Sequence, residues 1–87
     1  MTPISLEAQL AEQRMAHRAL LALPVFITEH EAEIRDMMHA RTVDGYPIFG
    51  DSGWRKSPYE LKRDMMEEAA DMANYQLMLW RRLATIL

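Results

Sequence analysis

The sequence predicts an all-α protein: three helices in an oligomeric bundle, the last helix being the longest. Apolar residues recur at helical spacing in three segments, and the segment 57–87 contains no glycine or proline after its first turn. The chain has 87 residues, of which 49% are apolar and none is cysteine. We therefore expect a single helical domain, residues 1–87, without disulfides.

The first helix is expected within residues 2–23. Thr2 or Ser5 can cap its start, and leucines recur along one of its sides. Pro24 then ends this helix or kinks it. Thr28 opens a second capping box, which favours a separate helix beginning near that residue. A single helix kinked at Pro24 is the alternative.

Helical periodicity disappears in residues 41–56, which hold all three glycines of the chain. Turns are expected at 44–45 and at 51–53, with a short extended or hairpin-like piece across 46–49. We therefore expect a loop rich in glycine and aromatic residues over 41–56. Loops of this length inside a small domain are usually functional.

The last helix is expected to span about 57–87. Ser57 can cap it, Pro58 suits the first helical position, and Glu60 completes a capping box. Two adjacent apolar stripes cover roughly 220° of its circumference, about twice what a surface helix needs. The first stripe consists of Leu61, Met65, Met72, Leu79, Leu83 and Ile86. So short a chain cannot cover this face alone, and we expect a homo-oligomer, most simply a twofold dimer.

The composition and the net charge argue against nucleic acid and membranes as partners. The net charge of −3 and the pI near 5.5 argue against binding to duplex nucleic acid. No apolar run reaches the length of a transmembrane span, and the N-terminal residues show no signal-peptide pattern. The lack of cysteine suits a reducing compartment. We expect a soluble, cytoplasmic protein with no membrane partner.

Carboxylates on two predicted helices could hold a metal. The long helix carries an E-E-x-x-D cluster, and the preceding helix can add a glutamate. Mg²⁺ and Mn²⁺ prefer such oxygen ligands. The candidate ligands are Glu33, Glu67, Glu68 and Asp71. Glu68 borders the apolar face and is expected to be half-buried. A solvated, ion-paired surface is the alternative interpretation of this cluster.

A second candidate site is a nucleotide-binding site at the start of the long helix. Aromatic side chains there can stack on a base, and cations and a helix N-terminus can bind phosphate. The candidate ligand-binding residues are Tyr46, Trp54, Arg55, Lys56, Ser57, Asn74 and Tyr75. The alternative is a loop folded back over the hydrophobic core, which is favoured for Phe49.

The run Glu68-Ala-Ala-Asp71, followed by Asn74 and Tyr75, resembles half of a known motif. It is similar to the second half of the motif of all-α nucleoside triphosphate pyrophosphohydrolases of the MazG and dimeric dUTPase type. In that family, E-E-x-x-E on one helix and E-x-x-D on the next bind magnesium, and pyrophosphate is released. The resemblance implies that residues 29–33, which read Glu-His-Glu-Ala-Glu, form the first half.

The layout also resembles, more loosely, small helical bacteriophage proteins without an assigned activity. We expect foremost a small oligomeric protein that binds or sequesters a nucleotide. The resemblance to bacteriophage proteins implies that it acts as a phage counter-defence protein. One alternative is a metal-dependent nucleoside triphosphate pyrophosphohydrolase using Mg²⁺ or Mn²⁺. Another is a protein-binding inhibitor of a host defence system. The sequence leaves open whether the protein is an enzyme.

Overall fold

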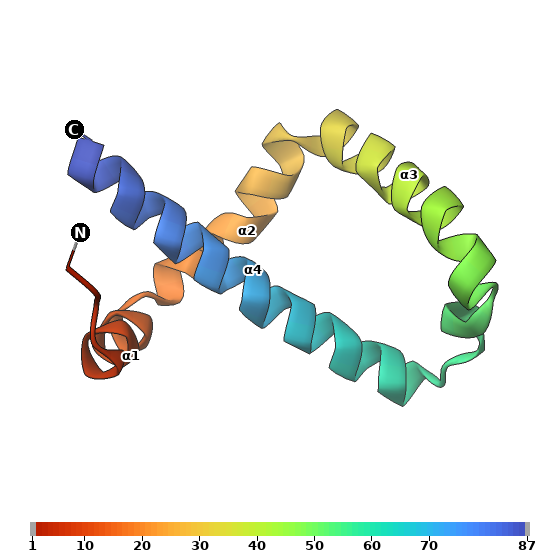
Figure 1. Ribbon diagram of the computed structural model, residues 1–87, viewed down its shortest axis with the longest axis horizontal. Helices are drawn as coiled ribbons and strands as arrows, with labels where there is room; N and C mark the ends of the chain where they lie inside the picture. Colours follow the sequence, from red (N-terminus) through yellow and green to blue (C-terminus); the bar gives the residue numbers. More distant parts are fainter. Residues whose placement is uncertain (1, 87) are drawn as a thin grey trace.

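A computed structural model describes residues 2–86, and this part of the chain is helical without any strand (Figure 1). The elements are α1 (Leu6–Met15), α2 (His17–Glu29), α3 (Glu31–Phe49), the 3₁₀-helix η1 (Ser52–Arg55) and α4 (Pro58–Ile86). The all-α prediction is confirmed, but the described residues form four α-helices instead of three. No helix among them is long and apolar enough to cross a membrane.

The predicted first helix is divided at Ala16. Ser5 caps α1, since its Oγ accepts a hydrogen bond from the Ala8 N–H at 3.2 Å. At Ala16 the backbone leaves helical geometry, and its N–H donates to the Gln13 carbonyl. No glycine or proline marks this break. The break allows α1 to turn away from α2, so that side chains of α1 reach the last helix.

Helix α2 continues through Pro24, so the prediction of a new helix near Thr28 is wrong. Thr28 is not a cap, because its Oγ1 donates to the Pro24 carbonyl at 2.8 Å within the same helix. The chain changes helix six residues later than Pro24, at His30. Leu23 and Phe26, on either side of the proline, line a pocket with residues of α4. Packing against α4 thus compensates for the hydrogen bond that Pro24 cannot make.

Replacing Pro24 by alanine should stabilise the fold by about 1–2 kcal/mol. The alanine N–H can donate to the Leu20 carbonyl, and the gain in helix propensity exceeds the greater flexibility of the unfolded chain. Thermal unfolding should show a melting temperature higher by roughly 5–10 °C. Pro58→Ala is the control, because Pro58 is at the first helical position and needs no N–H there. Equal gains from both substitutions would contradict this explanation.

The loop predicted over 41–56 is largely helical. Helix α3 runs to Phe49 and includes Gly45 and Pro47, so the extended piece expected at 46–49 is absent. The helix ends at Gly50, whose φ of 54° suits glycine and whose N–H donates to the Tyr46 carbonyl. Gly45 and Pro47 weaken a helix without always ending it, and the left-handed residue at Gly50 provides the actual stop.

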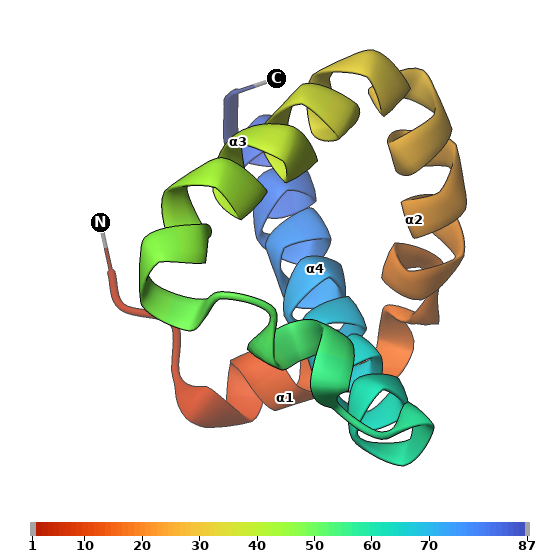
Figure 2. The same ribbon diagram turned by 90° about the vertical axis from the view of Figure 1, so that its right-hand side faces the viewer.

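The hydrophobic core lies where α2 crosses α4. Among the described residues, only Ala19 and Leu23 are buried, with 2% and 8% of their surface exposed, and α4 has no buried residue. Figures 1 and 2 show α2, α3 and α4 as three sides of an open frame, with α1 beside α4. The radius of gyration is 16.3 Å, against about 12 Å for a compact chain of this length. A single copy is therefore far from compact.

Candidate functional site

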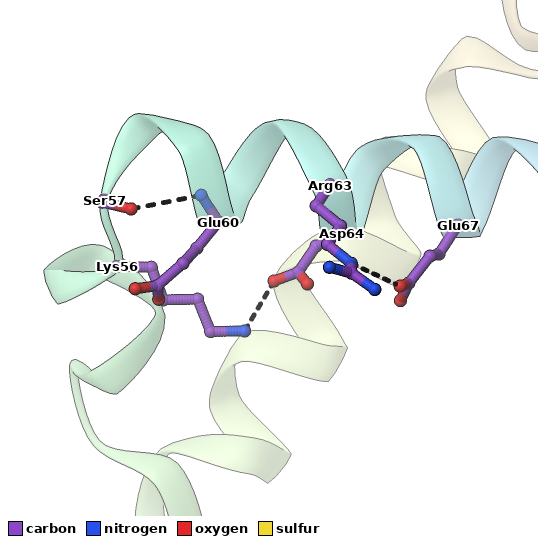
Figure 3. A network of polar contacts seen from close by, with 6 residues as sticks. All are labelled: Lys56, Ser57, Glu60, Arg63, Asp64 and Glu67. Carbon is purple, nitrogen blue, oxygen red and sulfur yellow. Dashed lines mark hydrogen bonds and ion pairs between the residues drawn. The ribbon is translucent and has the colours of Figure 1, made fainter.

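The first turns of α4 carry a network of polar contacts (Figure 3). Ser57 Oγ accepts a hydrogen bond from the Glu60 N–H at 3.2 Å, which confirms Ser57 as the cap. Lys56 Nζ lies 2.6 Å from Asp64 Oδ2. Pro58 has no N–H to offer, and the Glu60 N–H is already bonded. This helix N-terminus therefore presents few free N–H donors to an anion.

The hydrogen bond and the charge of Asp64 raise the pKa of Lys56 above its ordinary value of 10.5. The ammonium is thus favoured in the folded state, and its contribution to stability is complete below pH 10.5. The contribution is lost as the pH rises through the raised pKa. We expect Lys56→Met to lower the melting temperature slightly at pH 8, and the difference from wild type to vanish in strong alkali.

Lys62→Met is the control for this pH dependence, because Lys62 has no hydrogen bond or ion pair to any residue between 2 and 86. The Lys62→Met substitution removes a lysine without removing an ion pair, so its melting temperature at pH 8 should stay close to that of wild type. A pH-independent difference for Lys56→Met, measured by thermal unfolding from pH 8 to 12, would contradict the ion pair.

The predicted ligand-binding residues occupy two separate regions. Trp54 is 90% exposed on η1, and Arg55 beside it donates from Nε to Asp51 Oδ2 at 3.0 Å. Tyr46 is exposed on α3. Asn74 and Tyr75 lie about 24 Å along α4 from its start, given the rise per residue of a helix. The structure therefore does not gather the seven residues into one site.

Asn74 instead helps to attach α1 to α4. Its Oδ1 accepts a hydrogen bond from Gln13 Nε2 at 3.1 Å, and Arg81 Nε donates to Glu12 Oε1 at 2.7 Å. These four residues line a cavity of about 240 Å³ between the two helices. Glu12, Gln13 and Arg81 were not among the predicted site residues. Nothing in their local sequence indicates these partners.

The candidate metal ligands also lie apart in one chain. Glu33 is on α3, where Oε1 lies 3.5 Å from His30 Nδ1, and Glu67 pairs with Arg63 on α4. Glu68 and Asp71 are exposed and make no hydrogen bond or ion pair within residues 2–86. No three acidic or histidine side chains in that range are grouped so that they could hold a metal ion. Glu68, expected to be half-buried, is exposed in a single copy.

Comparison with known proteins finds no matching family model, no matching curated sequence and no matching solved structure. Function is therefore inferred from the geometry of the chain itself.

The most extensive feature of the surface is apolar. Large apolar side chains are exposed on α2, on α3 and along the whole of α4. Those on α4 are Tyr59, Leu61, Met65, Met66, Tyr75, Met78, Leu79, Leu83 and Ile86. Large apolar side chains exposed in such number are typical of sites that bind another protein. The apolar face of α4 is thus the strongest candidate for a functional surface.

Proposed function

We propose that this chain is a protein-interaction subunit, which works within a protein assembly that covers its apolar helical faces. The accessible surface of one copy supports this proposal. It amounts to 8180 Å², against about 5,300 Å² for a compact protein of the same mass. The excess of roughly 2,900 Å² exceeds what one partner contributes to a standard protein–protein interface.

The proposal is tested on the isolated chain at concentrations low enough to give monomers. Small-angle X-ray scattering should give a radius of gyration near 16.3 Å, and the chain should bind the dye ANS, which reports exposed apolar surface. A compact monomer with a radius near 12 Å and no dye binding would overturn the proposal. Such a monomer would have covered its apolar faces by itself.

We propose nucleotide binding near Trp54 as a second candidate function, supported by the almost complete exposure of its indole ring. An exposed aromatic face can stack on a nucleobase. A nucleotide should then quench the fluorescence of wild type and of Trp80→Phe, but not that of Trp54→Phe. Trp80 is the control, because it is the second tryptophan and lies on α4, partly covered. Unchanged emission of wild type across a nucleotide panel would contradict this candidate.

A further inference from the structure

A regular stripe of exposed residues runs along α4. Its members are alternately four and three residues apart: Leu61, Met65, Glu68, Met72, Tyr75, Leu79, Arg82 and Ile86. We call this stripe the seam. The spacing repeats every seven residues, which is the pattern of helices that pair along their length. Every member is exposed except Met72, which is partly covered where α2 passes beside α4.

The other helices leave most of the seam exposed. Leu23 and Phe26 of α2 line a pocket with three members of the seam, Met72, Tyr75 and Leu79. Elsewhere, α1 bonds to Asn74 and Arg81, and α2 lies beside Ala73 and Leu77. At 100° per residue, these positions are well away from the centre of the seam. In Figure 1, α3 stands apart from α4 as the far side of the frame. Helix α2 therefore borders the middle of the seam on one side, and the described chain supplies no helix that covers the seam along its length.

We propose that a second copy of this chain covers the seam, with the two α4 helices antiparallel about a twofold axis near residues 73 and 74. The proposal rests on the proposed function and names the partner. With 29 residues, α4 is about 43 Å long and offers a continuous contact. The excess surface of two copies, roughly 5,800 Å² in total, is at the upper end of what obligate homodimers bury. A twofold axis also covers the same face on both copies.

The two charged members of the seam decide the orientation. A parallel pair would place Glu68 against Glu68 of the partner subunit, and Arg82 against Arg82 of the partner subunit. Like charges facing each other in an apolar contact are costly. In the antiparallel pair, Glu68 lies opposite Leu79 of the partner subunit and one turn from Arg82 of the partner subunit. The charges next to each other are then opposite.

The antiparallel register also matches the apolar residues along the seam. Leu61 lies opposite Ile86 of the partner subunit, and Met72 lies opposite Tyr75 of the partner subunit. Leu61 and Leu61 of the partner subunit are then about 37 Å apart along the axis. The register and orientation of the two α4 helices can therefore be determined by finding which pairs of positions form a disulfide when replaced by cysteine.

Disulfide cross-linking tests this arrangement, because the chain contains no cysteine of its own. Leu61→Cys and Ile86→Cys chains are mixed under refolding conditions and oxidised. We expect a disulfide between the two different chains, and none when either variant is oxidised alone. Arg63→Cys, on the opposite side of α4, is the control and should not link to Ile86→Cys.

A disulfide formed by Leu61→Cys alone would show a parallel pair and overturn the proposal. Absence of the mixed disulfide would overturn it too, whatever the mass of the protein. The proposed function would be contradicted by a different result, namely a compact monomer that does not bind the dye. A monomer that keeps a radius near 16.3 Å and binds dye removes the second copy as the partner, but it leaves the apolar face as a protein-binding surface.

Discussion

Replacing Met65 by lysine should convert the proposed dimer into monomers and raise its dissociation constant about 1,000-fold. Met65 is 72% exposed in one copy and would be buried in the seam by the second. Burying such a side chain contributes about 2 kcal/mol, and a twofold dimer loses this contribution twice. The new ammonium would also lie beside Arg82 of the partner subunit. Sedimentation velocity over a concentration series measures the change.

Met66→Lys is the matched control. Met66 is the same residue type, is 64% exposed and is the next residue along the helix. It points about 100° away from Met65 and lies outside the seam. The dissociation constant of this variant should stay within a few-fold of wild type. Equal weakening by both substitutions would contradict a contact confined to the seam.

Replacing Leu23 by alanine should produce the largest loss of stability within one copy. Leu23 is one of the two buried residues in the described chain, at the crossing of α2 and α4. A leucine-to-alanine change at such a site costs about 2–5 kcal/mol. In a domain of this size, the melting temperature should fall by roughly 10 °C or more. Circular dichroism during heating measures the fall.

Leu21→Ala serves as the control for this loss. Leu21 lies on the same helix, two residues away, and is 69% exposed. Its truncation should change the free energy of unfolding by about 0.5 kcal/mol at most. A loss for Leu21→Ala comparable to that for Leu23→Ala would mean that the crossing of α2 and α4 is not the core.

The sequence predicted the fold best where local signals agree. Ser57 caps α4 and Pro58 begins it, as expected, because a cap and the N–H that it accepts from are only three residues apart. The prediction failed where local signals are weak or are overridden by packing. Ala16 divides the first helix without any breaker residue, and α2 continues through Pro24 because it packs against α4.

The candidate site could be predicted only in part. The periodicity of α4 predicted an apolar stripe, and five of its members belong to the seam: Leu61, Met65, Met72, Leu79 and Ile86. The contacts between α1 and α4 could not be predicted, since Gln13 and Asn74 are 61 residues apart in the chain. The exposure of Glu68 was also predicted wrongly. Glu68 was expected to be half-buried because its neighbours on the helix are apolar, but it is exposed in one copy. In the proposed dimer, burial of those neighbours depends on the second copy, which the sequence of one chain does not display.

The mass of the wild-type protein in solution tests the central claim most directly. Sedimentation equilibrium at micromolar concentration should give twice the chain mass of 10.2 kDa. The same measurement should give 10.2 kDa for Met65→Lys and the doubled mass for Met66→Lys. A wild-type protein that sediments as a single species of 10.2 kDa under these conditions would contradict the antiparallel dimer.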